Sequence, residues 1–101
     1  MDRREELQAL LESLLGSKQV YYQPPENIKM SYPALVYFKN RIDTKKANDK
    51  TYQKMTRYEI TVIDRRPDHV VIHKILDLPY ASYDRYYVSD NLHHDVLTLY
   101  Y

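Results

Sequence analysis

Two of the four histidines, His69 and His73, are spaced as a pair of metal ligands often is. Four residues apart on a helix, they would place two imidazoles on one face. His93, His94 or Asp95 would have to supply a third ligand, and the pair lacks the glutamate of the zinc-protease motif. Nothing in the sequence brings the two segments together. We therefore expect these histidines to be exposed or structural, and we predict no metal site and no cofactor.

Other residue patterns that could support catalysis are weak. Asp84 and Arg85 lie near Asp90 and Asp95 in the sequence, but acid–base catalysis needs carboxyl groups paired in a cleft. No serine occupies a glycine-rich elbow, and a single glycine excludes phosphate-binding loops of the P-loop and dinucleotide types. The absence of cysteine excludes a thiolate nucleophile and a disulfide framework, and it fits synthesis in a reducing cytoplasm. We predict that the protein is not an enzyme.

The most informative charge pattern is local. Residues 39–57 contain seven lysines and arginines and only two aspartates, which gives this segment a formal charge of +5. The rest of the chain has eight cations and twelve acidic residues, a charge of −4. Such a basic arm on an acidic body could contact a phosphate backbone or an acidic patch on a neighbouring subunit, or it could be a solvated hairpin tip. The seven cations are Lys39, Arg41, Lys45, Lys46, Lys50, Lys54 and Arg57.

Tyrosine is the second unusual feature, with twelve in the chain, one Phe and no Trp. Neighbouring tyrosines on a strand point to opposite faces, so only one of each doublet can enter a single core layer. Because tyrosine is common at protein interfaces, we favour a subunit interface over rim packing or base stacking. The predicted interface comprises Tyr83, Asp84, Arg85, Tyr86 and Tyr87.

A helix is predicted at the start of the chain, over residues 2–15. Asp2 and Glu5 have capping-box spacing, and Gly16 suits a left-handed C-cap. The helix carries an apolar stripe with the periodicity of one helical face. Its members are Leu7, Leu10, Leu11, Leu14 and Leu15.

Alternation and apolar runs predict five strands, over residues 19–22, 32–42, 51–64, 82–88 and 94–101. The run from Ala34 to Phe38 is typical of a central strand covered on both faces, and 32–64 should form a long hairpin. Residues 69–78 favour a second helix, capped by Asp68, although their β-branched residues also suit a strand. We predict an α+β fold with one mainly antiparallel sheet and two helices, in the order α-β-β-β-α-β-β.

Length and overall charge restrict the possibilities further. At 101 residues the chain is one domain, 1–101, with a modest core. Its net charge of +1 indicates neither a dedicated nucleic-acid binder nor a membrane-surface protein. We expect no signal peptide and no membrane span, because no apolar run has the required length.

Short segments spread over most of the chain form a pattern that resembles the tail terminator, or tail completion, proteins of tailed bacteriophages. They are Val20–Pro25, Met30–Tyr37, Tyr58–Asp64, Arg66–Asp68, Leu78–Pro79, Ser82–Tyr87, Asp90–Asp95 and Leu99–Tyr100. The resemblance implies a small structural protein of the virion neck, made in the host bacterial cytoplasm. It would form a hexameric ring that ends the tail tube and joins tail to head.

The resemblance also implies the partners: further copies of the chain, the tail tube protein, the head-tail connector or stopper protein, and genomic DNA passing through the lumen. Two alternatives stay open. The chain could be the head-side connector or stopper ring protein, or a small nucleic-acid-binding module that uses the basic hairpin 39–57.

Overall fold

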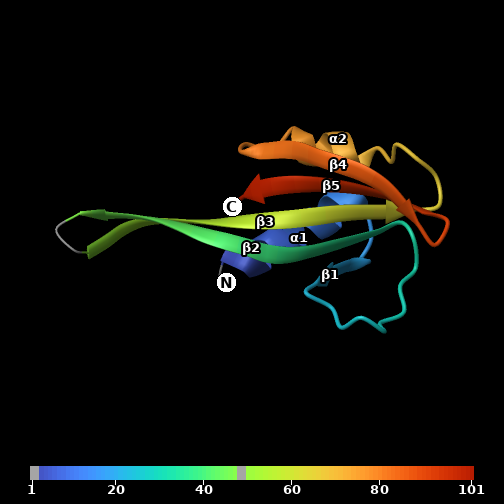
Figure 1. Ribbon diagram of the computed structural model, residues 1–101, viewed down its shortest axis with the longest axis horizontal. Helices are drawn as coiled ribbons and strands as arrows, with labels where there is room; N and C mark the ends of the chain where they lie inside the picture. The colour runs from blue at the N-terminus through green and yellow to red at the C-terminus, as the bar shows by residue number, and fades with distance from the viewer. Residues whose placement is uncertain (1–2, 48–49) are drawn as a thin grey trace.

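The computed structural model describes residues 3–47 and 50–101, with side chains over 3–44 and 55–101. It contains one sheet of five strands and two helices in the predicted order, so the α+β prediction is confirmed (Figure 1). The elements are α1 (Arg3–Leu15), β1 (Val20–Tyr22), β2 (Ala34–Ala47), β3 (Lys50–Asp64), α2 (Val71–Leu76), β4 (Ala81–Ser89) and β5 (Leu92–Tyr100).

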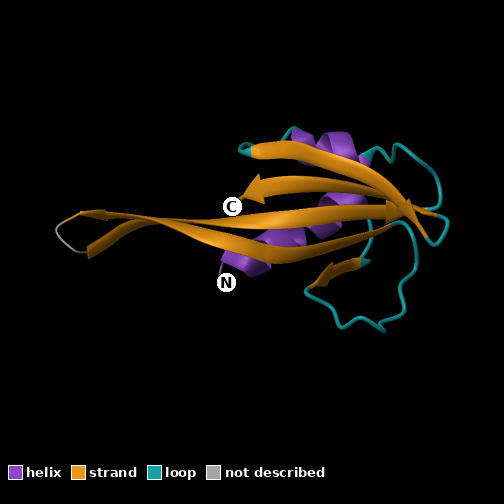
Figure 2. Ribbon diagram, viewed as in Figure 1, coloured by secondary structure: helices purple, strands orange, loops and turns teal. Residues whose placement is uncertain are grey.

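The strand order in the sheet is β1-β2-β3-β5-β4. Only β1 and β2 pair in parallel, and the other pairs are antiparallel (Figure 2). The predicted central strand, β2, lies inside the sheet, but β3 occupies the middle position. The two edges differ in length: β1 has three residues, whereas β4 has nine.

The predicted long hairpin is confirmed as β2 and β3, which pair from Ala34 and Ile63 out to Ala47 and Lys50. β1 pairs only with residues 35–37, and β5 reaches only to Arg57. The far part of the hairpin therefore projects beyond the other strands, and the molecule measures 51 × 23 × 23 Å (Figure 1). We call residues 39–47 and 50–57 the arm. Its threonines suit an extended strand pair without helical cover.

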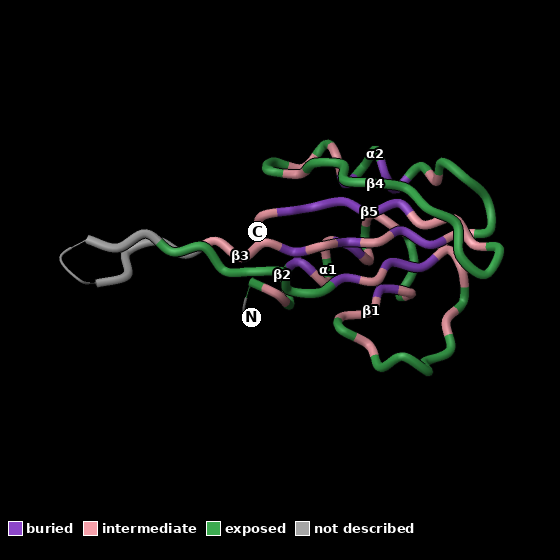
Figure 3. The backbone as a smooth tube through the Cα atoms, viewed as in Figure 1, coloured by how far each residue is buried: buried purple, intermediate pink, exposed green. Residues whose placement is uncertain are grey.

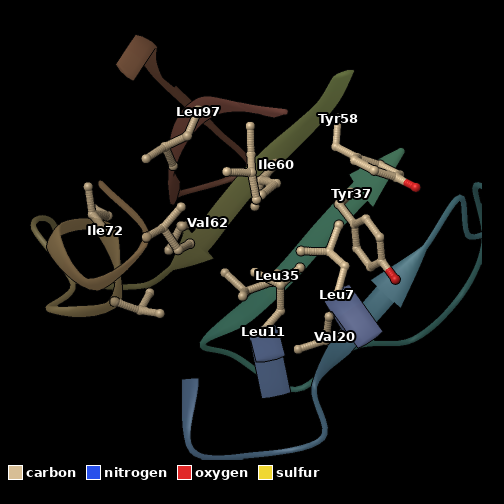
Figure 4. Packing of buried hydrophobic residues seen from close by; sticks show 13 residues of the cluster. Leu7, Leu11, Val20, Leu35, Tyr37, Tyr58, Ile60, Val62, Ile72 and Leu97 are labelled. Carbon is tan, nitrogen blue, oxygen red and sulfur yellow. The ribbon is translucent and has the colours of Figure 1, made fainter. Parts of the chain in front are cut away.

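The core lies between one face of the sheet and both helices (Figure 4). Leu7 and Leu11 of α1 are fully buried, and they pack with the alternating residues of β2 and β3. Gly16 ends α1 with φ +83°, the left-handed conformation predicted for it, and its N–H donates to the carbonyl of Glu12 at 2.9 Å. The buried set is Leu7, Leu11, Val20, Leu35, Tyr37, Tyr58, Ile60, Val62, Val71, Ile72, Ile75, Leu97 and Leu99.

Helix α2 is shorter than predicted, since it covers only Val71–Leu76 of the expected residues 69–78. The predicted Asp68 cap is wrong: Asp68 has φ +60°, and the N-cap is Val70, with no side-chain cap bond. Instead, Nδ1 of His69 accepts the N–H of Val71 at 3.0 Å. This imidazole satisfies one of the free donors at the helix start, the role that was expected of the carboxylate.

The other face of the sheet is not covered by a helix in the described part of the chain. Ala34 and Val96 are nevertheless buried there by neighbouring strand side chains. Nearer the arm, Val36 is half-buried and Phe38 is 37% exposed. The expectation that 34–38 is covered on both faces is therefore wrong, because both helices pack on the Leu35 and Tyr37 side.

Candidate functional site

The edge strand β4 is the most exposed regular element of the described fold. Every residue from Ser82 to Ser89 is exposed, and only Ala81 is half-buried (Figure 3). Large side chains that proteins usually cover are open to solvent here. We call them the aromatic edge: Tyr80 (72% exposed), Tyr83 (45%), Tyr86 (51%), Tyr87 (40%) and Val88 (53%).

A register shift between Tyr83 and Arg85 distributes these side chains over both faces of β4. Tyr83 pairs with Leu97 and Tyr86 with Asp95, on the helix side of the sheet. Arg85 pairs with Val96, on the uncovered side. Because of the extra residue at this bulge, Tyr83 before the bulge and Tyr86 after it both lie on the helix side of the sheet.

Tyr83 is anchored within its own chain. Its hydroxyl donates to Oδ1 of Asp95 at 2.6 Å, and Asp95 is only 7% exposed. This hydrogen bond, followed by burial, raises the pKa of Tyr83 from 10.0 to about 12, because the neutral phenol is the better partner for the carboxylate. Tyr83 therefore fixes β4 to β5 as well as presenting a ring to solvent.

Two tyrosine–histidine stacks hold the outer half of β4, one on each face. Tyr86 lies 5.9 Å from His93, with 20° between the rings, and its hydroxyl is 3.0 Å from Nδ1 of His93. Tyr87 stacks on His94 at 4.6 Å and 12°. The opposite facing of a tyrosine doublet, expected from the sequence, is thus seen at Tyr86 and Tyr87. Both rings are therefore held against side chains of β5.

The charges predicted for this surface are paired within it. The Arg85 guanidinium lies 2.8 Å from Asp84 and 3.5 Å from Glu59, so it bridges β4 to β3 across β5. The five predicted interface residues, 83–87, are therefore gathered on one exposed strand. Asp84 and Arg85 compensate each other, and the aromatic rings remain the dominant open surface.

The described part of the arm is basic with exposed apolar side chains. Arg41 pairs with Asp43 at 3.1 Å and donates to the hydroxyl of Tyr100 at 3.2 Å. Ile42 is 49% exposed, and we did not single it out from the sequence. The sequence signal that could have identified this exposed side chain is a single isoleucine within a polar stretch. Lys39 is exposed and Arg57 half-buried, whereas Lys45, Lys46, Lys50 and Lys54 lie outside the residues whose side chains are described.

The histidines do not form the pair considered from the sequence. α2 begins at Val71, so His69 precedes the helix while His73 lies on it, and Nδ1 of His69 already accepts the N–H of Val71. Nδ1 of His94 lies 3.0 Å from the Leu92 carbonyl. Among the described residues, no group of three or more His, Cys, Asp or Glu side chains could hold a metal ion.

A small apolar hollow of about 200 Å³ lies at the start of α1, between Arg3, Leu78, Tyr80 and Tyr101. The Arg3 guanidinium stacks over the Tyr101 ring at 4.1 Å, and Arg4 stacks over Tyr22 at 4.7 Å. These cation–π contacts tie the helix start to the last residue of the chain and to β1. The sequence pattern gave no indication of them.

Comparison with protein-family models and with curated proteins finds no match. The function must therefore be argued from the residues and their arrangement. Neither helix of the described part is long and apolar enough to cross a membrane.

Proposed function

We propose that this chain is a structural protein of a tailed-phage neck. In this proposal, copies of it assemble into a ring at the head-proximal end of the tail, where they terminate the tail tube and join the tail to the head. Its partners are other copies of itself, the tail tube protein, the connector or stopper protein, and the genomic DNA in the lumen.

The observation that carries the proposal is the position of the segments that resemble tail terminators. Most of them fall on one continuous part of the fold: β3, the turn after it, the two residues 78–79 that follow α2 and its C-cap, and the β4–β5 hairpin. That part includes the aromatic edge. A subunit with a modest core and a large open aromatic strand is typical of proteins that neighbouring subunits stabilise.

Electron microscopy of the purified protein, alone and mixed with assembled tail tubes, tests this function. We expect rings attached to one end of each tube. Rings that bind the head-side portal and ignore tubes would favour the connector or stopper alternative. Particles that stay small in both samples, together with absence of the protein from virions, would contradict the proposal.

A second candidate, a nucleic-acid-binding module, is favoured by the formal charge of +5 on a hairpin that projects from the body. The test is DNA affinity measured over a range of salt concentrations. If the arm binds phosphates, the combined change Lys45→Ala, Lys46→Ala and Lys50→Ala should lower the slope of log affinity against log salt by about 0.9 per lysine. The matched control removes three exposed body lysines, Lys18, Lys29 and Lys74. Equal loss in both variants would contradict specific binding by the arm.

A further inference from the structure

Besides the outer edge of the three-residue strand β1, the described fold leaves two longer strand edges without a pairing partner. The first is the outer edge of β4, the last strand in the order β1-β2-β3-β5-β4. The second is the arm, because no strand of the described part pairs with the outer sides of residues 40–47 or 50–55. Unpaired strand edges are templates for adding a further strand.

The hairpin turn shows which groups of β4 face outward. Asp90 and Asn91 have φ +54° and +62°, which indicates a two-residue turn of type I′. In such a hairpin the flanking residues, Ser89 and Leu92, form a hydrogen-bonded pair, and pairs then alternate along the strands. Tyr86 and Val88 therefore direct their N–H and C=O groups away from β5. The bulge limits the regular free edge to residues 85–89.

The arm of one molecule cannot fill the β4 edge of the same molecule. It continues β2 and β3 straight outward, and β5 separates those strands from β4 (Figure 2). A contact between the arm and β4 therefore requires two copies. The two surfaces differ, so a ring or chain of copies uses the arm of each copy on one neighbour and its β4 edge on another, whereas a two-fold dimer would exchange both arms between the same two copies.

Side chains and charges on the two surfaces are complementary. Residues 39–57 have a formal charge of +5, Ile42 of the arm is exposed, and Phe38 is exposed directly before the arm. The β4 edge has exposed aromatic rings, with Asp90 at its turn and Asp68 close enough to Tyr83 to raise the pKa of its phenol. The one cation on the strand, Arg85, is already paired with Asp84 and Glu59. The body as a whole has a charge of −4, which attracts the arm of another copy.

We propose that the arm of one copy docks on the outer edge of β4 in a second copy, adding a strand to its sheet. The inference deepens the proposed function, since it rests on the self-assembly that a ring requires, and it assigns the surfaces of that assembly. The contact is heterologous, so it closes into a ring where the rotation between copies permits and otherwise continues as a filament.

Sedimentation velocity over protein concentrations from about 1 µM to about 1 mM measures the association. The arm is removed by replacing residues 42–56 with Asn-Gly, which joins the paired residues Arg41 and Arg57 by a two-residue turn. We expect the wild type to associate and the arm-shortened protein to stay monomeric. A wild type that is monomeric throughout, or an arm-shortened protein that associates equally well, overturns the inference.

The β4 edge is tested at Val88. Val88→Pro removes an outward N–H that β5 does not use, and we expect it to weaken association about fivefold to tenfold. The control Val88→Ala retains the N–H and should weaken association by less than about twofold. If the proline variant fails to fold, Val88→Lys and Val88→Glu form a second pair. The lysine should weaken binding of the basic arm and the glutamate should not. Equal effects of Pro and Ala, or of Lys and Glu, overturn the pairing.

A mixture of two defective copies makes the decisive test. One copy lacks the arm and keeps β4, and the other carries Tyr86→Pro with Val88→Pro and keeps the arm. We expect one-to-one dimers and nothing larger, because only one compatible contact exists between them. A mixture that stays monomeric while the wild type associates overturns the arm-to-β4 contact.

These results separate the inference from the proposed function. Association that depends on the arm and on β4, in a protein that binds no tail tube, supports the contact and contradicts the neck function. Rings on tube ends that survive both arm removal and Val88→Pro support the neck function and overturn the contact.

Discussion

The hydrogen bond from Tyr83 to Asp95 should make a measurable contribution to stability. Tyr83→Phe removes the hydroxyl that lies 2.6 Å from Oδ1 of Asp95 and leaves a carboxylate that is only 7% exposed without this donor. Hydrogen bonds to a charged group contribute about 1.5–3 kcal/mol. Because Tyr83 is 45% exposed, solvent screening reduces the expected loss to about 1 kcal/mol. For a domain of this size, that loss lowers Tm by about 5 °C.

Urea unfolding at pH 7 measures the loss in the free energy of unfolding. Tyr87→Phe is the matched control, since the Tyr87 ring stacks on His94 through its face and keeps that contact. In a double-mutant cycle, Tyr83→Phe should cost little once Asp95→Ala has removed the acceptor. A loss below about 0.5 kcal/mol, the range of ordinary surface substitutions, would refute the reasoning. An equal loss in the Asp95→Ala background would refute it as well.

The same contact predicts a pH dependence. The pKa of Tyr83 rises from 10.0 to about 12 in the folded protein, so the folded state retains the phenol proton more strongly than the unfolded state does. The stabilisation is therefore complete below pH 10 and is lost as the pH rises through 12. Burial also raises the pKa of Tyr37, so tyrosine Cζ chemical shifts followed by NMR should show late titration at both Tyr83 and Tyr37. The Tyr83 signal should disappear in Tyr83→Phe, and the Tyr37 signal should remain.

Three further substitutions test the fold by chemical denaturation. Leu11→Ala should cost about 2–5 kcal/mol, because Leu11 is fully buried in the core beneath the sheet, and a cost under 1 kcal/mol would contradict that packing. Gly16→Ala should cost about 1 kcal/mol through backbone strain alone, since φ is +83° and no atom lies within 4 Å of an added Cβ; Ser13→Ala, at an exposed position of α1, is the comparison. Asn91→Gly should stabilise by about 0.5 kcal/mol, because glycine adopts φ +62° without the cost that asparagine bears, and a destabilised variant would refute the turn assignment.

Local patterns were sufficient to predict most of the elements. The Tyr58, Ile60 and Val62 alternation of β3 specifies one buried face, and this prediction is confirmed. The leucine stripe of α1 is confirmed in part: Leu7 and Leu11 are buried and Leu14 and Leu15 pack partly buried against the core, whereas Leu10 is not part of the core cluster. Gly16 marks the end of α1 because its φ is accessible to glycine at low cost. These signals lie within a few residues of the structure that they determine, so a single sequence is enough to read them.

Features that depend on distant segments could not be predicted in the same way. The sequence of β4 predicts a strand, but its position at the sheet edge follows from β5 pairing with both β3 and β4. The Tyr83–Asp95 bond depends on the register of that pairing. For α2, the sequence between Asp68 and Pro79 is compatible with helices of several lengths, because its β-branched residues do not mark where a helix begins or ends. The buried positions of Val71, Ile72 and Ile75 select a short helix packed on the core.

The cation–π contact between Arg3 and Tyr101 places the first described turn of α1 beside the end of the described chain (Figure 1). The two ends of the described chain therefore lie close to each other in space. A short linker could join these two points, and the chain could be opened instead in the exposed segment 25–29, which belongs to neither helices nor strands. A circular permutant of residues 3–101 opened there would keep the described strand pairings and would begin and end next to β1, at the sheet edge opposite β4. Labels or fusion partners attached there would leave the arm and the aromatic edge free.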